Sequence, residues 1–445
     1  MAQGFSKKIQ SSRDAAYRFA DFELYPHDRL LKRCGVAIPL QPKSFDALLC
    51  LVGRAEHLVS KQELNKVLWP DVHVSETNLT NLIGGLRKIV GREAIQTVSK
   101  HGYRFELPVA GEPGVAQETY EKFLRAKELT GQRSIESMSC ARDLLWTCLA
   151  EDPGFAAAWA WLGRCCWFLD KFSAASPANP GLAQAAFQRA FALDSDLACA
   201  HQFHTFVQVD TGQADEAIQR LRSRLERHPG EPESLTGLVQ AFRFRGLLDG
   251  SLEAHRQAAR LDPAVQTSVA HTWFLAGEYG CAIETYGGRA AYYLDAAAWA
   301  ALGHEKRAIA LLRERLAKES LSGLMNALMG SLLALLQGRT DQGVRIMDQA
   351  DTTRDPEILV YFARHYARGK HTEKAVQALH RAAQAGFVCA PITLRTDPWL
   401  SPLRKQRQFE SLLQEFEAVV QQAQSHHRDR GGRLKQPSAT PFSRF

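Results

Sequence analysis

The stretch VSETNLTNLIGGLRKIV, residues 74–90, has the apolar spacing of an amphipathic helix. Its apolar positions recur at intervals of three and four residues: Leu79, Leu82, Ile83, Leu86, Ile89 and Val90. The opposite face is small and polar and contains two adjacent glycines, Gly84 and Gly85. An internal glycine costs a helix roughly 1 kcal/mol relative to alanine. The sequence therefore raises the question of what this bare surface provides.

Along the segments before this helix, the apolar spacing changes from that of strands to that of helices. Residues 17–24, YRFADFEL, alternate apolar and polar side chains as one strand does, and residues 29–40 resemble a hairpin that turns at Cys34–Gly35. Residues 42–52 and 60–68 then follow helical spacing. The sequence thus predicts a short sheet followed by helices.

Local signals predict where these helices begin. Pro42 suits a first helical turn. Ser60 and Glu63 have the spacing of a capping box, and Ser75 is placed to cap the helix within 74–90.

The order of elements indicates a DNA-binding unit. The helices within 60–68 and 74–90 are joined by WPDVHV, and IQTV (95–98) and YRFEL (103–107) form a hairpin after them. A helix-turn-helix places its second helix in the major groove of DNA. The following hairpin is then the wing.

Four segments resemble the OmpR/PhoB-type winged-helix domain, which is also found in the ToxR and CadC group of regulators. They are LQPKSFDALLCLV, LVSKQELNKVLWPD, VSETNLTNLIGGLRKIVG and IQTVSKHGYRFELPV, and they cover 40–109 almost without gaps. The closing GYRF after a TV strand is a strong marker. The resemblance implies a winged-helix DNA-binding domain over 17–109.

The polar face of the 74–90 helix suits base recognition. Thr77, Asn81, Gly84 and Lys88 lie opposite the apolar face at 100° per residue. Asparagine pairs with adenine, and threonine offers a hydroxyl and a methyl group to thymine. Basic residues at the helix end, Arg87 and Lys88 among them, are placed for phosphates.

The resemblance adds contacts to this set. Residues that match Thr77, Asn81, Leu82, Gly84, Gly85 and Arg87 touch DNA in the family, and wing positions that match Lys100 and His101 reach a minor groove or phosphate. The predicted DNA-binding residues are Thr77, Asn78, Thr80, Asn81, Gly84, Gly85, Arg87, Lys88, Lys100 and His101.

The glycine pair departs from the family, in which recognition helices usually carry arginine or another long polar residue there. One interpretation is that bare backbone lets the helix approach the DNA closely. The other is that the position has drifted, so that the domain binds more weakly and less selectively. The sequence leaves both interpretations open.

The second part of the chain has a repeat signature. Pro229 and Pro263 are 34 residues apart, the tetratricopeptide (TPR) interval, and so are two glycines and two aspartates in the same region. Residues 157–169 fit the W-x₂-L-G helix pattern of these repeats. The predicted fold is mainly α: a winged helix-turn-helix followed by an α-solenoid of TPR-like hairpins, with about seven helix pairs in 118–390.

The expected organisation follows. Residues 17–109 form the winged helix, 110–117 a linker with the turn-rich GEPG, 118–424 the repeats, and 425–445 a disordered basic tail.

Composition sets the cellular context. The chain has 445 residues, its net charge is +7, and the excess lies near the two ends, including five basic against two acidic side chains within 75–104. This basic excess is a weak hint of nucleic acid. The nine cysteines contain no CxxC pair, and neither a membrane span nor a signal peptide is visible. We expect a cytoplasmic protein without cofactor or metal.

Three functional hypotheses remain. The first is a transcriptional regulator that binds double-stranded DNA and whose repeats bind a protein, a peptide or a second copy. The second is an interaction scaffold whose winged helix no longer binds DNA. The third, an enzyme, has the least support, because the sequence contains no P-loop, H-E-x-x-H or G-x-S-x-G motif.

Overall fold

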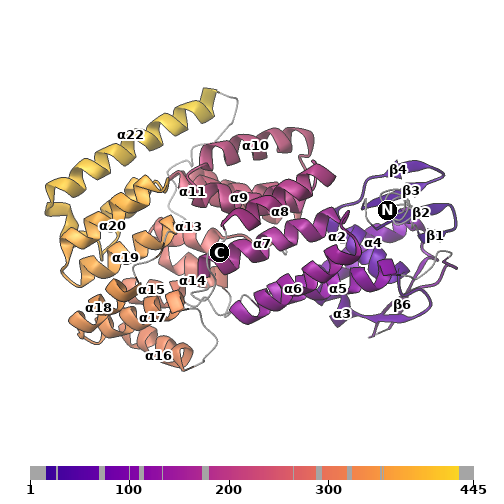
Figure 1. The fold of residues 1–445 in the computed structure, drawn as a ribbon, viewed down its shortest axis with the longest axis horizontal. Helices are drawn as coiled ribbons and strands as arrows, with labels where there is room; N and C mark the ends of the chain where they lie inside the picture. The colour runs from indigo at the N-terminus through magenta and orange to yellow at the C-terminus, as the bar shows by residue number, and fades with distance from the viewer. Residues whose placement is uncertain are drawn as a thin grey trace, which may run out of the picture. The chain divides into compact units, whose positions relative to one another are not determined.

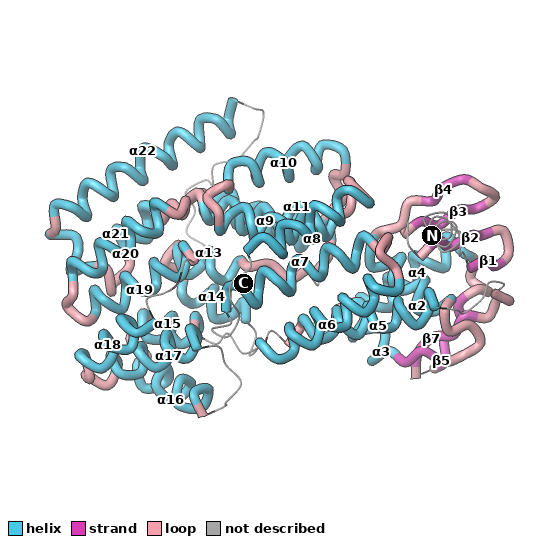
Figure 2. Tube along the Cα trace, viewed as in Figure 1, coloured by secondary structure: helices cyan, strands magenta, loops and turns pink. Residues whose placement is uncertain are grey.

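The computed structural model describes most of the chain: residues 17–26, 29–69, 76–99, 101–109, 115–132, 134–172, 180–263, 265–286, 293–317, 323–350, 353 and 355–429. The chain forms two compact units, Met1–His204 and Thr205–Phe445. Figure 2 shows the strands (magenta) gathered near the N-terminus and helices (cyan) along the rest of the chain. The predicted mainly α fold is confirmed.

The first sheet contains one more strand than the sequence suggested. Its four antiparallel strands, in spatial order, are β1 (Tyr17–Phe19), β2 (Phe22–Tyr25), β3 (Leu30–Arg33) and β4 (Val36–Ile38). The prediction of one strand over 17–24 is wrong, because the chain reverses at Ala20, where φ is +46°. The turn at Cys34–Gly35 is confirmed: both residues have positive φ, which two-residue hairpin turns of type I′ require.

The helix-turn-helix and the wing follow in the predicted order. The elements are α2 (Pro42–Val52), β5 (Leu58–Ser60), α3 (Lys61–Leu68), α4 (Glu76–Val90), β6 (Ile95–Val98) and β7 (Gly102–Phe105). Strand β5 was not predicted because three residues are too few to show an alternating apolar pattern. It pairs with β7, so the predicted hairpin is part of a three-stranded sheet of order β5-β7-β6. A Cβ on Gly102 would lie 2.0 Å from the Val59 carbonyl oxygen, so this crossing requires glycine.

The apolar face of α4 closes the core of this domain. Leu79, Ile83, Leu86 and Val90 are buried, as predicted, whereas Leu82 and Ile89 are half-buried. These residues lie in the domain whose core also contains Phe19 and Phe105, which meet edge to face at 5.0 Å. The burial of one face fixes which face of α4 points outward.

Helical hairpins complete the first unit. They are α5 (Val115–Thr130) with α6 (Ile135–Glu151), and α7 (Ala156–Phe172) with α8 (Pro180–Leu193), followed by the start of α9 (Ala198–Asp210). A Cβ on Gly163 of α7 would lie 2.8 Å from the Phe187 ring of α8, which explains the glycine of the W-x₂-L-G pattern. Helix α5 begins within the predicted linker 110–117.

The second unit continues the hairpins. Its elements are α10 (Ala214–Arg227), α11 (Pro232–Phe244), α12 (Leu248–Leu261), α13 (Val269–Leu275), α14 (Tyr279–Tyr286), α15 (Leu294–Ala301), α16 (Glu305–Leu316), α17 (Gly323–Leu336), α18 (Thr340–Ala350), α19 (Pro356–Arg368), α20 (Thr372–Gln384), α21 (Pro391–Thr396), the 3₁₀ helix η1 (Ser401–Lys405) and α22 (Arg407–Asp429). Figure 1 labels most of them. From α5 to α20 the described residues give eight helix pairs, one more than predicted. The 34-residue period fades after α12 because α13, α14 and α15 are short.

Glycine turns separate the two helices of most pairs in the second half of the chain. Their positive φ values are a left-handed conformation that glycine adopts without strain. They are Gly212, Gly246, Gly277, Gly303 and Gly338. In the pair α19/α20, Lys370 takes this conformation with φ of +64°, and Gly369 is instead confined by Val344, 2.6 Å from its would-be Cβ.

Helix α19 is enclosed by the rest of the second unit. Residues 356–367 are all buried, polar side chains included. Glu357 pairs with Arg243 of α11 (Oε1–Nε, 3.0 Å), and Arg364 with Asp397 (Nε–Oδ2, 2.6 Å). His365 bonds to Tyr293 and Ser331, both at 2.8 Å, and burial lowers its pKa to about 3, so this imidazole is neutral. Within this unit α19 is therefore a central helix.

The C-terminal boundary also differs from the prediction. Helix α22 continues to Asp429, so the predicted border between repeats and tail at 424/425 falls inside a helix. The remainder of the predicted tail lies outside the described residues.

Candidate nucleic-acid interface

The helix-turn-helix is set up by a capping box at the start of α3. The Ser60 Oγ accepts from the Glu63 backbone N–H (3.1 Å), and a Glu63 carboxylate oxygen accepts from the Ser60 N–H (2.9 Å). These bonds satisfy helix-terminal donors and fix where the chain leaves β5. The predicted cap Ser75 lies outside the described residues.

The polar face of α4 is open to solvent. Exposed residues on it are Thr77, Thr80, Asn81, Gly85 and Lys88, and half-buried ones are Asn78 and Gly84. These side chains share one helix, and the buried Ile83 and Leu86 lie on the other side. The predicted base-reading surface is therefore accessible within its unit.

The two glycines serve no packing role inside the domain. A Cβ on Gly84 or on Gly85 would have no atom within 4 Å. Alanine would fit at both positions and would favour the helix. The glycines therefore either allow close approach to DNA outside the domain or have drifted. Both interpretations from the sequence stay open.

Arg87 binds the wing. Its Nε and Nη2 donate to the Ile95 carbonyl oxygen (2.9 and 2.7 Å), and Nη2 also donates to Thr97 Oγ1 (2.7 Å). Its guanidinium lies 5.9 Å from the centre of the Tyr103 ring. The sequence suggested a phosphate contact, but this geometry assigns most of the guanidinium to joining α4 to β6.

The wing presents a polar outer surface. Arg104 of β7 donates to Gln96 Oε1 of the paired strand β6 (2.7 Å) and to Glu106 Oε1 just beyond its own strand (2.6 Å). His101 is exposed at the turn, and its carbonyl oxygen accepts from the Lys61 N–H (3.1 Å). Lys100 lies outside the described residues. The Gln96–Arg104 pair was not identified from the sequence, although the outward alternation of the hairpin could have indicated it.

Aromatic residues of this domain support the surface from beneath. Tyr103 and Phe105 are buried under the wing. Trp69 is 5% exposed, and the Lys43 ammonium lies 5.2 Å from the centre of its ring. This burial indicates a packing role for Trp69.

Arg87→Ala is expected to loosen the wing in the absence of DNA. Losing charge-assisted bonds worth about 1.5–3 kcal/mol each should raise amide exchange in β6 by about tenfold or more. Hydrogen exchange with mass spectrometry measures this, with the exposed Arg92→Ala as control. Unchanged exchange in β6, with a loss of DNA affinity alone, would instead make Arg87 a phosphate ligand.

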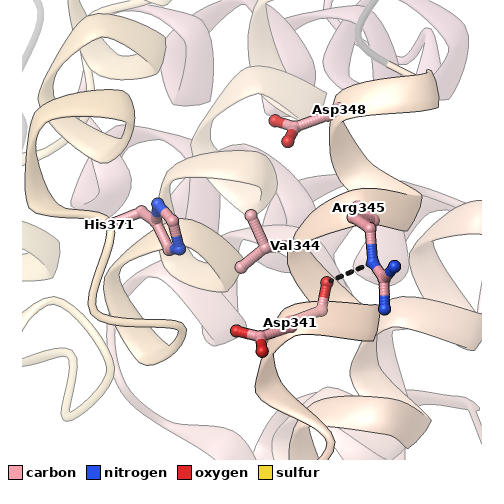
Figure 3. Close-up of a pocket in the computed structure, with 5 residues that line it drawn as sticks. All are labelled: Asp341, Val344, Arg345, Asp348 and His371. Carbon is pink, nitrogen blue, oxygen red and sulfur yellow. Dashed lines mark hydrogen bonds between the residues drawn. The ribbon is translucent and has the colours of Figure 1, made fainter.

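A pocket in the repeats offers no cluster of side chains comparable to the polar face of α4. It measures about 380 Å³ and is lined by Asp341, Val344, Arg345, Asp348 and His371. Figure 3 shows Val344 between His371 and Arg345. The Asp348 carboxylate is already bound by the Lys374 ammonium (2.8 Å). Among the described residues, no group of three or more histidine, cysteine or acidic side chains could hold a metal ion.

Comparison with known proteins identifies the N-terminal domain. Residues 35–105 match the family described as "Transcriptional regulatory protein, C terminal". Over 95 residues the chain is 36% identical to the transcriptional regulator HilA of Salmonella typhimurium, which is 20% of this chain and 17% of HilA. The matched part is thus under a fifth of that relative's length. The N-terminal domain is a winged helix of this regulatory family.

The solved structures that align with this chain include a repeat protein. A tetratricopeptide repeat protein from Parabacteroides merdae aligns with 60% of this chain and 99% of its own, at 11% identity and a TM-score of 0.33. EmbR of Mycobacterium tuberculosis aligns with 54% of this chain and 59% of its own, at 20% identity and a TM-score of 0.18. At such scores the TPR-like character rests on the packing of this chain's own hairpins.

No helix in the described part of the chain is both long enough and apolar enough to cross a membrane.

Proposed function

We propose that this chain is a cytoplasmic, one-component transcriptional regulator that binds specific DNA sequences. Helix α4 enters the major groove, and the wing lies on the adjacent groove or backbone. The repeats bind a protein, a peptide or a second copy of the chain. The proposal requires no cofactor and no catalytic activity.

One observation carries this proposal: the exposed polar face of α4 is joined directly to the wing. Five residues of that face are exposed, and Arg87 bridges α4 to Ile95 and Thr97 of β6. A helix and a wing held in fixed geometry can contact two neighbouring parts of a duplex with little loss of entropy on binding. The match of residues 35–105 to a regulatory family supports the same function.

The residues divide into two roles under this proposal. Asn81 and Thr77 read base edges, because amide and hydroxyl groups match the donors and acceptors of the major groove. Lys88, with Lys100 and His101 of the wing, contacts phosphates and fixes the register. Asn78, Thr80, Gly84 and Gly85 complete the surface that faces the groove.

An interaction scaffold is the alternative. The bare glycines and the engagement of Arg87 by the wing favour it, because both reduce the side chains available for DNA. A scaffold would show no salt-dependent association with DNA, whereas a regulator must release counterions on binding.

Binding of the full chain to a duplex, followed by fluorescence anisotropy at several salt concentrations, tests the two roles. Lys88→Ala should weaken binding to every sequence and reduce the salt slope by about 0.9, the value for one phosphate contact. Asn81→Ala should leave that slope unchanged and cost about 1–3 kcal/mol at the adenine-containing site. The opposite pattern would reverse the assignment, and no DNA association in the wild type would favour the scaffold.

A further inference from the structure

We propose that Asp46 couples the DNA-binding domain to the first helical hairpin, so that the winged helix and α5 respond to their ligands as one body. The coupling goes beyond the proposed function and concerns its regulation. It rests on a buried carboxylate that takes partners from both parts of the first unit. The linker sequence alone suggested a hinge.

On the DNA-binding side, Asp46 is held by Arg29. The Asp46 side chain lies on α2 and is 6% exposed, and Arg29 Nη1 is 2.7 Å from its Oδ1. Arg29 also donates to the Pro42 carbonyl oxygen (2.9 Å) and lies over the Phe45 ring at 5.0 Å. This arginine is therefore fixed to the start of α2 from two directions.

On the repeat side, α5 supplies two further partners. The Lys127 ammonium is 3.1 Å from Asp46 Oδ2 and 11% exposed. The Tyr120 hydroxyl donates to Asp46 Oδ1 at 3.3 Å, and its ring packs near Phe123 and Phe155. The residues bonded to Asp46 from α5 are thus part of the packed core of the hairpins.

The charges of Arg29 and Lys127 hold Asp46 in its ionised form at this contact. Burial by itself raises the pKa of Asp46, but the charges of Arg29 and Lys127 outweigh it and lower the pKa to about 2. Two half-buried cations thus share one buried carboxylate. Loss of Asp46 would leave both cations without their carboxylate. Loss of Lys127 leaves the Arg29–Asp46 pair in place but removes the charge-assisted bond that joins Asp46 to α5.

A continuous path joins this cluster to the recognition helix. Helix α2 packs against α4, and α5 packs against α3 (Figure 1). A ligand that shifts α5 must therefore move or strain α2 and α3, both of which support α4. Packed elements transmit such shifts because interiors resist compression.

The test compares two variants of α5 in the full chain without DNA. Lys127→Met removes the buried ammonium and keeps an apolar side chain of similar length. Arg125→Met removes a 57% exposed cation of the same helix, paired with Glu128 on the surface. Because Asp46 then loses its charge-assisted bond to α5, we expect amide exchange in residues 42–52 and 118–130 to rise by about tenfold or more in Lys127→Met. Exchange should stay unchanged in Arg125→Met.

A milder variant, Tyr120→Phe, and a measurement with DNA added extend this test. Should Lys127→Met not fold, Tyr120→Phe removes one hydrogen bond and should accelerate exchange in the same two segments to a smaller extent. Equal exchange in wild type, Lys127→Met and Tyr120→Phe would overturn the coupling. With DNA added, protection should extend from α4 into α5 in the wild type and stop at α2 in Lys127→Met. Failure of the wild type to bind DNA would refute the proposed function, whereas the exchange measured without DNA would still decide whether Asp46 couples the two parts.

Discussion

Replacing Arg243 with methionine is expected to lower the free energy of unfolding of the second unit by about 3–5 kcal/mol. Arg243 is 2% exposed and holds both carboxylate oxygens of Glu357, at 3.0 and 3.2 Å. It also donates to Ser268 Oγ at 2.8 Å. The substitution leaves the charge of Glu357, which lies on α19, buried with a weaker set of partners.

Urea unfolding followed by circular dichroism measures the effect. Arg256→Met is the matched control, because Arg256 is 50% exposed and pairs with Glu253 on the surface of α12. The control should lose about 1 kcal/mol at most. The double variant Arg243→Met/Glu357→Leu should regain much of the stability, since no charge is then left unpaired. A loss in Arg243→Met no larger than in Arg256→Met would contradict the central role of α19.

Replacing both glycines of the recognition helix by alanine is expected to separate stability from DNA binding. Nothing lies within 4 Å of either added methyl group, so the helix should gain roughly 1 kcal/mol at each position. If the bare backbone approaches the groove closely, the same methyl groups should reduce DNA affinity by about tenfold or more, the equivalent of about 1.4 kcal/mol.

Thermal unfolding and anisotropy titrations of Gly84→Ala/Gly85→Ala give both quantities. Gly280→Ala provides the control, since Gly280 lies in α14 with equally open space and far along the chain from the DNA-binding domain. It should stabilise its helix and leave DNA binding unchanged. A stabilised double variant that binds DNA with unchanged affinity would favour drift at these positions over close approach.

Local signals in the sequence were sufficient for much of the DNA-binding domain. The apolar face of α4, the Ser60 capping box and the Cys34–Gly35 turn each depend on residues a few positions apart. The outward face of α4 followed from the same periodicity. The DNA-contacting roles of its residues stay predictions.

What the sequence did not reveal depends on partners distant in the chain. Arg243 and Glu357 are 114 positions apart, and Lys127 and Asp46 are 81 apart, so neither pair leaves a local pattern. The same holds for α19, whose polar residues look like a solvated face until the helices around it are placed. Arg87 was assigned to phosphates because the sequence does not show that the wing places the Ile95 carbonyl oxygen within its reach.

The most direct test of the account is a selection of bound sequences from a random pool of double-stranded DNA, made with the full chain and with Asn81→Ala. We expect one enriched motif for the wild type and a relaxed preference at one or two base pairs for the variant. A wild-type selection without an enriched motif, or an identical motif from both proteins, would contradict the claim that the exposed face of α4 reads DNA.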